Sequence, residues 1–200
     1  MITQDTLFGI AMGGNLPFRG CSPTSTATLA QDGPAATLSC ALAALPRAGF
    51  AIRAVSRFYR TPCFPPGAGP DFVNAAVLAD APLGPQEALD HLHAIEAEMG
   101  RERGERWSAR TLDLDLLFAG DAVLPDPDTQ DAWRALPPEE QARRAPGRLI
   151  LPHPRLQDRG FVLVPLAEIC PGWTHPRTGQ TVRQMLEALP DPEREAIHAL

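Results

Sequence analysis

Aspartate and leucine alternate strictly in residues 112–116, LDLDL, within the longer segment RWSARTLDLDLL. Side chains two residues apart lie on the same face of an extended strand, so this pattern predicts a strand over residues 111–119. Asp113 and Asp115 lie on one face of that strand, and the leucines on the other face pack into a core. Because aspartate is depleted in strands, two aspartates on one strand face indicate a functional role.

The two carboxylates, about 7 Å apart on one strand face, invite a divalent cation, and oxygen-only ligands favour a hard ion such as Mg²⁺. Four arginines precede them within ten residues: Arg101, Arg103, Arg106 and Arg110. Carboxylates that hold a metal beside several arginines are typical of a site for a magnesium-bound polyphosphate. The alternative is an edge strand with a solvated face beside a solvated arginine surface, but the short separation of the two groups favours the site.

The chain contains no lysine, so all 18 of its basic residues are arginines. A Walker P-loop requires a lysine on the phosphates, and a protein kinase requires its strand lysine, so both classes are excluded. If the protein handles ATP, arginines and metal ions must neutralise the phosphate charge. Arginine suits this role because its planar guanidinium group binds phosphate oxygens bidentately.

Length and composition indicate one globular domain with a core of its own. The net charge of −6 argues against nucleic acid as a partner, and no apolar run is long enough to span a membrane. The first residues lack the basic and apolar regions of a secretory signal. The cysteines show no CxxC spacing and are expected to be free thiols, which predicts a cytoplasmic protein; they are Cys21, Cys40, Cys63 and Cys170.

Strand and helix patterns alternate along the chain. Strands are expected at 6–12, 50–60, 71–81 and 111–119, and helices at 35–45, 85–99, 181–189 and from about residue 158. Taken in order along the chain, the first six elements are strand, helix, strand, strand, helix, strand. This is the split βαβ order of a ferredoxin-like α/β sandwich. The predicted fold class is therefore α+β, with an antiparallel sheet. The polar, proline-rich segment 125–148, with a helical centre at 129–144, is predicted to be an insertion in a single domain of residues 1–200.

Four blocks of the sequence, in order, resemble the 6-hydroxymethyl-7,8-dihydropterin pyrophosphokinase family of the folate pathway. They are GGNL (13–16), SRFYRTP…PDFVNAAV (56–77), IEAEMGRER…RWSARTLDLDLL (95–117) and LPHPRLQDRGFVLVPLAEICP (151–171). The resemblance implies a ferredoxin-like fold and transfer of the pyrophosphoryl group of ATP to the hydroxymethyl group of the dihydropterin, with release of AMP. It also implies a catalytic set in which two aspartates hold two Mg²⁺ ions and two arginines clamp the phosphates: Asp113, Asp115, Arg101 and Arg110.

The resemblance further implies a pterin site, whose matching positions are Thr61, Pro62, Phe64, Phe72, Asn74, Trp107 and Phe161. Phe72 and Phe161 would lie on the two faces of the flat ring, and the amide of Asn74 would match the ring edge. Apart from the resemblance, both phenylalanines would be interpreted as core residues. Asn74 differs, because an asparagine is unfavourable in a strand and its buried amide is expected to have a partner.

The resemblance also implies a nucleotide site, whose matching positions are His93, Glu96, Arg103, Leu116, Arg148, His153 and Arg159. The chain departs from the family pattern in several places: Phe72 replaces a common tyrosine, Ser108-Ala109 replaces Gly-Pro, Gly104 follows Arg103, and Ile150 and Pro154 lack a hydroxyl that some members have. No function for the insertion follows from the sequence.

Three other functions compete with this one: a ferredoxin-like regulatory module that binds a pterin or nucleotide, a metal-dependent nuclease, and a kinase that makes ADP. The paired aspartates argue against the first, and the acidic net charge argues against the second. The third differs only in its product. The general base is left open between Asp115, a metal-bound water and no dedicated base, and a monomer is expected.

Overall fold

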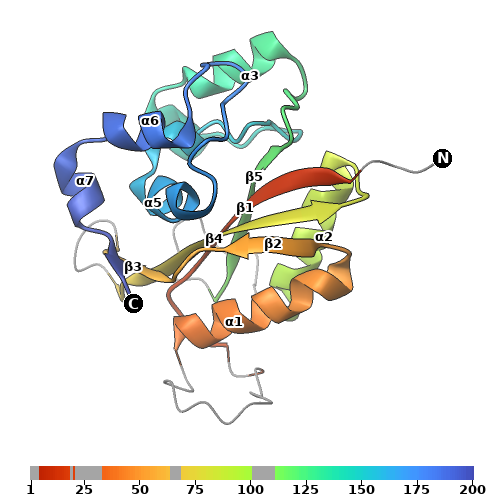
Figure 1. The fold of residues 1–200 in the computed structure, drawn as a ribbon, viewed down its shortest axis with the longest axis vertical. Helices are drawn as coiled ribbons and strands as arrows, with labels where there is room; N and C mark the ends of the chain where they lie inside the picture. The colour runs from red at the N-terminus through yellow and green to blue at the C-terminus, as the bar shows by residue number, and fades with distance from the viewer. Residues whose placement is uncertain (1–4, 19, 21–32, 64–68, 101–110) are drawn as a thin grey trace.

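The computed structural model describes residues 5–18, 20, 33–63, 69–100 and 111–200 of the chain. These residues form one sheet, whose strands are β1 (Thr6–Gly14), β2 (Ala51–Val55), β3 (Tyr59–Thr61), β4 (Phe72–Ala81), β5 (Asp113–Ala119) and β6 (His198–Ala199). The order is β5-β1-β4-β3-β6, with β2 also paired to β4, and all pairs are antiparallel. Figure 1 shows this sheet crossing the molecule.

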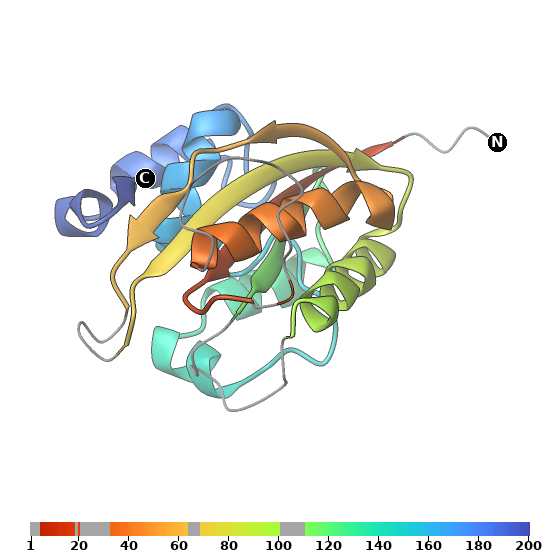
Figure 2. The ribbon, with the colours of Figure 1, turned by 90° about the horizontal axis from the view of Figure 1, so that it is seen from below.

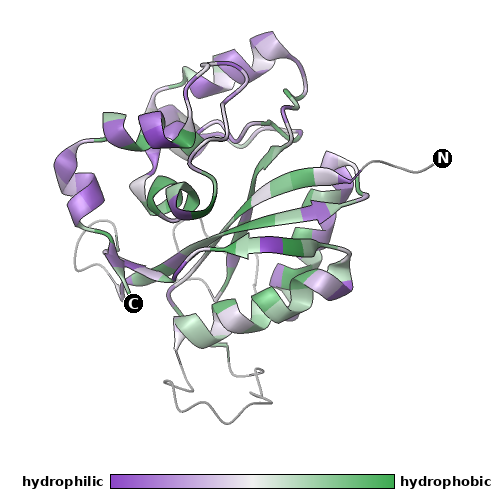
Figure 3. Cartoon of the chain, viewed as in Figure 1, coloured by the Kyte–Doolittle hydropathy of each residue, from purple (hydrophilic) through white to green (hydrophobic). Residues whose placement is uncertain are grey.

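Helices cover both faces of the sheet (Figure 2). Helices α1 (Pro34–Ala44) and α2 (Pro85–Glu98) pack on one face, where Leu38 and Leu92 are fully buried. Helices α5 (Gly160–Ile169) and α6 (Val182–Ala188) pack on the other face, around Leu163 and Met185. Figure 3 shows that the apolar residues follow the strands and α5, whereas α7 (Asp191–Glu195) is hydrophilic. The predicted α+β sandwich with an antiparallel sheet is confirmed.

The predicted strand over residues 50–60 is wrong in one respect, because it divides into β2 and β3. Both halves pair with β4, but residues 56–58 lie between them outside the ladder. At the break, the backbone N–H of Ala76 donates to the hydroxyl of Ser56 (2.9 Å), and that hydroxyl donates to the carbonyl of Arg57 (2.8 Å). A side chain therefore replaces the backbone acceptor that a continuous strand would offer.

Strand β5 has the predicted alternation. Leu112, Leu114 and Leu116 are buried in the core beneath α1 and α2, while Asp113 and Asp115 are half-buried on the opposite face. The register against β1 shifts between Gly9 and Ile10, so β5 carries a bulge near its end. The carboxylates thus lie on the α5 face of the sheet, beyond the part that α5 covers.

The predicted insertion forms α3 (Pro127–Arg134) and α4 (Pro138–Arg143). Its base is closed by two backbone hydrogen bonds between Leu124 and Leu151, of 2.8 and 3.1 Å. Gln130 is fully buried and donates to the carbonyl of Pro152 (3.2 Å). Asp131 accepts two hydrogen bonds from Arg177, which join the insertion to the segment before α6. These contacts fix the insertion to the loop that precedes α5 and to the segment that precedes α6.

His175 is fully buried beside the insertion, and its Nδ1 accepts hydrogen bonds from the backbone N–H groups of Arg177 (3.1 Å) and Thr178 (3.4 Å). Burial, followed by the charge of Arg134, lowers the pKa of His175 to about 4; Arg177 acts in the same direction and Asp131 opposes them. The unfolded chain therefore binds a proton on this residue below pH 6.5, whereas the folded protein does so only near pH 4.

Between these two pH values, we expect the free energy of unfolding to rise with pH, by at most about 1.4 kcal/mol per pH unit from this residue. The variant His175→Gln should have a smaller slope, because glutamine does not titrate. Urea unfolding at several pH values across this window measures the slope. His198→Gln, at an exposed position, serves as control and should keep the wild-type slope; an unchanged slope in His175→Gln would contradict the assignment.

Three of the four cysteines lie in the described part of the chain. Cys40 is disulfide-bonded, whereas Cys63 and Cys170 are free. The expectation of a free thiol is therefore wrong for Cys40, since the cysteine spacing carries no information on which parts of the chain meet in the fold.

Within the described ranges, no helix combines the length and apolar character needed to cross a bilayer.

Candidate active site

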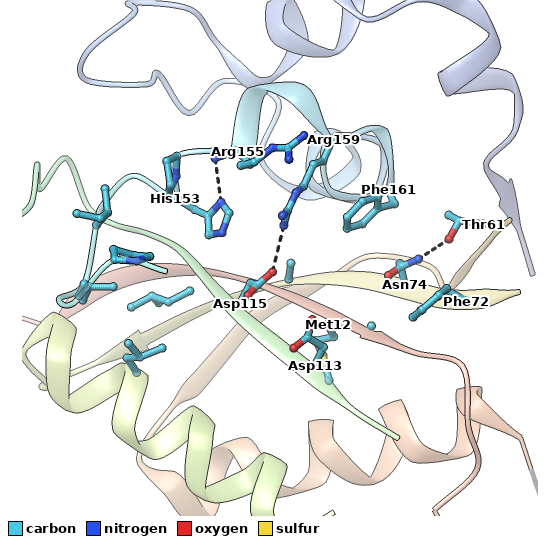
Figure 4. Close-up of a pocket in the computed structure, with 18 of the residues that line it drawn as sticks. Met12, Thr61, Phe72, Asn74, Asp113, Asp115, His153, Arg155, Arg159 and Phe161 are labelled. Carbon is cyan, nitrogen blue, oxygen red and sulfur yellow. Dashed lines mark hydrogen bonds and ion pairs between the residues drawn. The ribbon is translucent and has the colours of Figure 1, made fainter. Parts of the chain in front are cut away.

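A cavity of about 880 Å³ opens on the α5 face of the sheet. Figure 4 shows three groups of polar and aromatic side chains: Asp113, Asp115 and Arg159 lie near the middle, His153 and Arg155 at one end, and Thr61, Phe72, Asn74 and Phe161 at the other. The middle group comes from β5 and the N-terminus of α5, the second from the loop before α5, and the third from β3, β4 and α5. Residues far apart in the sequence therefore meet in one cavity.

The strand register determines how far the carboxylates in the middle of the cavity lie from the end that contains Asn74. Gly13 of β1 lies directly opposite Asn74 of β4 and, on its other side, directly opposite Asp113 of β5. Neighbouring strands are about 4.8 Å apart, so Asn74 and Asp113 are about 10 Å apart across the sheet. The amide of Asn74 and the carboxylate of Asp113 thus lie on either side of Gly13, which has no side chain between them.

The carboxylate group in the middle has a cationic neighbour. Arg159, at the N-terminus of α5, donates to Asp115 with 3.4 Å between Nη1 and Oδ2. Burial lowers the pKa of Arg159 below its usual range, and the charge of Asp115 opposes that shift. The guanidinium group is also 5.6 Å from the ring centre of Phe161. Arg159 thus joins the carboxylates to the aromatic end of the cavity.

His153 presents a neutral imidazole to the cavity. Its Nδ1 accepts a hydrogen bond from the backbone N–H of Arg155 (3.1 Å), as Figure 4 shows. Burial, followed by the charges of Arg159 and Arg155, lowers the pKa of His153 to about 3. With Nδ1 an acceptor, the hydrogen of the neutral ring lies on Nε2. His153 is therefore a hydrogen-bond donor that carries no charge near neutral pH.

The aromatic end contains a fixed amide. Asn74 is 5% exposed, and its Nδ2 donates to Thr61 Oγ1 at 2.6 Å, which confirms that the amide has a partner. Phe161 is 40% exposed although it is a large apolar side chain, and Phe72 lies beside the same opening (Figure 4). A flat ligand that covers both rings would remove this apolar surface from water.

Gly13 leaves the space that Asn74 occupies. A Cβ at residue 13 would lie 2.6 Å from the Oδ1 atom of Asn74, closer than real Cβ contacts. We expect Gly13→Ala to displace the amide and to raise the KM of a substrate that binds over Asn74 about tenfold, since such overpacking costs about 1–3 kcal/mol. Steady-state kinetics measures this, with Gly172→Ala as control because nothing lies within 4 Å of a Cβ there. An unchanged KM would show that the amide tolerates the methyl group.

The other sequence-predicted residues divide into three sets. Pro62, Leu116 and Arg148 line the cavity, together with the residues described above. His93 and Glu96 are not among its lining residues; the Glu96 carboxylate instead accepts a hydrogen bond from the backbone N–H of Leu114 (2.7 Å). Their contact with a nucleotide stays a prediction. The remaining residues lie outside the described ranges: Phe64, Arg101, Arg103, Trp107 and Arg110.

Sequence reasoning missed several lining residues: Asn15, Gln86, Trp133, Arg144 and Arg155. Two of them had a local signal. Asn15 follows Gly13-Gly14 at the end of a strand and donates to the carbonyl of Pro70 (3.3 Å), and Arg155 lies in the LPHPR motif. Trp133 and Arg144 lie in the insertion, where no pattern pointed to the cavity.

The donor set fits Mg²⁺. The described residues include no cluster of three or more histidine, cysteine, aspartate or glutamate side chains, so Asp113 and Asp115 would supply the protein ligands. Both are half-buried carboxylates that face the cavity. Mg²⁺ is usually held by one or two carboxylates, with water and substrate phosphates as the other ligands. Asp113 and Asp115, two carboxylates on one strand face that line the cavity, match this mode of Mg²⁺ binding.

A family model described as 7,8-dihydro-6-hydroxymethylpterin-pyrophosphokinase (HPPK) matches residues 10–171. The chain belongs to the HPPK family. The match extends from β1 through α5 and therefore includes the elements that carry both ends of the cavity. The resemblance stated from the four sequence blocks is thereby confirmed.

Relatives named 2-amino-4-hydroxy-6-hydroxymethyldihydropteridine pyrophosphokinase are similar over most of the chain. The Synechocystis protein is 44% identical over 140 residues, which are 70% of this chain and 61% of that protein. The Methylorubrum extorquens protein is 38% identical over 151 residues, 76% of this chain and 80% of that protein. The chain thus spans less than two thirds of the length of the Synechocystis protein and more than two thirds of the length of the Methylorubrum extorquens protein.

Solved structures of Plasmodium falciparum HPPK-DHPS share the fold. The wild-type protein superposes with a TM-score of 0.60 at 13% identity, over 92% of this chain and 44% of that chain. A variant crystallised with pterin and p-hydrobenzoate superposes with a TM-score of 0.62 over 98% of this chain and 48% of that chain. At this identity the likeness concerns the fold alone.

Proposed function

We propose that the chain transfers the pyrophosphoryl group of ATP to the hydroxymethyl group of 6-hydroxymethyl-7,8-dihydropterin, giving AMP and the pterin diphosphate for folate biosynthesis. The observation that supports this is the strand row Asn74–Gly13–Asp113, in which an amide suited to a pterin edge lies about 10 Å from a carboxylate suited to a metal–phosphate complex. Membership of the HPPK family supports the same reaction.

The aromatic end of the cavity would bind and orient the acceptor. The pterin ring is flat and offers an amide-like edge, so Phe72 and Phe161 suit its faces and the Asn74 amide suits its edge. Thr61 holds the amide in one orientation through the 2.6 Å hydrogen bond. A ring held in this way directs its hydroxymethyl group toward the middle of the cavity, where the carboxylates lie.

The middle of the cavity would hold the polyphosphate. ATP is proposed to bind with two Mg²⁺ ions on Asp113 and Asp115, and the ions would neutralise the charge of the phosphate oxygens. Arg159 is within reach of the same region and can donate to phosphate oxygens bidentately. His153, neutral and protonated on Nε2, adds a donor without adding charge. The arginines proposed from the sequence, Arg101 and Arg110, would supply the remaining positive charge.

In the reaction, the hydroxymethyl oxygen forms a bond to the β-phosphorus as its proton is lost. The bond between the β-phosphorus and the oxygen that bridges it to the α-phosphate breaks, and AMP leaves with that electron pair. The β- and γ-phosphates move together to the pterin. We further propose that residues 1–200 act as one domain, as a monomer in the cytoplasm, with the pterin and ATP as small-molecule substrates.

Incubation with ATP, Mg²⁺ and the hydroxymethyl dihydropterin, followed by separation of the nucleotides, tests the proposal. We expect AMP to form only when the pterin is present, in an amount equal to the pterin consumed. ADP as the product would indicate a kinase, and nucleotide hydrolysis without pterin would indicate a phosphatase. Either result would overturn the proposed function.

A further inference from the structure

Residues of the insertion form part of the cavity wall. Trp133 of α3 and Arg144, which follows α4, line the cavity together with residues 146–149. The guanidinium carbon of Arg144 is 5.5 Å from the ring centre of Trp133, so the two side chains contact each other. The insertion thus contributes to the site an aromatic ring and a planar cation.

The contacts of the insertion show which end of the cavity it forms. Gln130, one turn before Trp133, donates to the carbonyl of Pro152, the residue before His153. Residues 149 and 150 connect the insertion directly to the same loop. His153 lies at the end of the cavity opposite Asn74, with Asp115 between them (Figure 4). Trp133 therefore belongs to the end away from the proposed pterin site.

The chemistry of this pair suits a planar heterocycle. Trp133 is partly exposed in the cavity, and Arg144 is largely exposed while it forms an ion pair with Glu140 (3.5 Å). Indole rings and guanidinium groups both stack on the flat faces of bases, and such stacking adds to binding affinity. Neither group is a ligand for the metal ions, and an indole ring offers nothing to phosphate oxygens except one N–H donor.

The insertion is held firmly enough to position a ring. Asp126 caps α3 by accepting hydrogen bonds from the backbone N–H (2.8 Å) and the hydroxyl (2.7 Å) of Thr129. Arg177 donates twice to Asp131, which lies on the same helix. Asp131 and the neighbouring buried Gln130 thus tie α3 to the rest of the protein, while the Asp126 cap fixes the start of the helix. A fixed helix loses little conformational entropy when a ligand binds against it.

We propose that Trp133 and Arg144 contact the base of the bound nucleotide, which makes the insertion the base-binding wall of the site. The inference rests on the proposed function, because it takes the nucleotide to lie at the His153 end of the cavity. It assigns a purine ring to the Trp133–Arg144 pair and the phosphates to the Asp113–Asp115–Arg159 group. Trp133 and Arg144 are then residues for nucleotide affinity and base selectivity.

Calorimetry with two probes separates base contact from phosphate contact. Mg-ATP contains the base, whereas Mg-tripolyphosphate contains only the phosphate chain. We expect Trp133→Ala to weaken Mg-ATP binding about tenfold, corresponding to about 1.4 kcal/mol, and to leave Mg-tripolyphosphate binding unchanged. Trp133→Phe should restore most of the ATP affinity, since phenylalanine can still stack. Arg144→Ala should weaken ATP binding, whereas Arg143→Ala, an exposed neighbour outside the cavity lining, should not.

The outcomes distinguish the two proposals. If the wild-type protein makes AMP and Trp133→Ala binds ATP normally, the base-binding inference is overturned and the proposed function stands. Equal weakening of ATP and tripolyphosphate in Trp133→Ala would show a general distortion of the site and would also overturn the inference. If the wild-type protein binds tripolyphosphate as tightly as ATP, the base adds nothing to affinity and the inference fails, whereas the proposed function fails only if no pterin-dependent AMP is formed.

Discussion

Asp115→Asn is expected to lower the rate of pyrophosphoryl transfer by at least about a thousandfold, equivalent to about 4 kcal/mol of transition-state free energy. The substitution keeps the shape of the side chain but removes the charge that would hold the metal and that pairs with Arg159 at 3.4 Å. Asp113→Asn is expected to act in the same direction. Single-turnover kinetics with saturating ATP and pterin measures the loss.

Binding of the pterin should survive in the same variant, because Asn74 and Phe72 lie on β4, away from the altered strand. A control is Asp121→Asn, which makes the same chemical change at an exposed turn that follows β5 and should leave the rate unchanged. A loss of pterin affinity equal to the loss of rate would point to misfolding of the site. Retained turnover in Asp115→Asn would exclude a metal role for this residue.

The largest expected effect on stability comes from Glu96→Ala. Glu96 is 3% exposed, and one oxygen of its carboxylate accepts from the backbone N–H of Leu114 at 2.7 Å. Strand β5 lies at one edge of the sheet, so this N–H needs a partner from outside the ladder. Without it, a buried donor is left unsatisfied, and we expect a loss of about 1–3 kcal/mol in the free energy of unfolding.

Glu96→Gln separates the hydrogen bond from the charge, because the amide oxygen of glutamine can still accept from Leu114. We expect this variant to regain most of the stability in urea unfolding. Since Leu114 lies between Asp113 and Asp115, Glu96→Ala should also lower the rate through displacement of the two carboxylates. If Glu96→Ala is as stable as the wild-type protein, then β5 is held in place by its pairing with β1 and by packing alone.

The sequence predicted those features that depend on local periodicity or on a single unfavourable residue. The alternation of Asp113 and Asp115 with leucines identified both the core face and the cavity face of β5, and it holds in the structure. The unfavourable position of Asn74 predicted a partner, which is Thr61. Both inferences need only the two-residue period of a strand and the cost of burying an amide.

The features that sequence reasoning missed depend on contacts between distant segments. Trp133 reaches the cavity because Gln130 and Asp131 join α3 to residues that come more than 20 positions later. The hydrogen bond from the backbone N–H of Leu114 to the Glu96 carboxylate joins α2 to a strand edge, which no local pattern reveals, and the contact of Glu96 with a nucleotide stays a prediction. The break between β2 and β3 depends on one serine hydroxyl that replaces a backbone group. Such contacts follow from packing rather than from periodicity.

The central claim is that two phosphates move together to the acceptor, and ATP labelled at the β-phosphorus tests it most directly. With wild-type protein, Mg²⁺ and hydroxymethyl dihydropterin, we predict that the label appears in the pterin product and that the nucleotide product is unlabelled AMP. In Asp115→Asn this transfer should be lost. Label that remains with the nucleotide as ADP would contradict pyrophosphoryl transfer by this site.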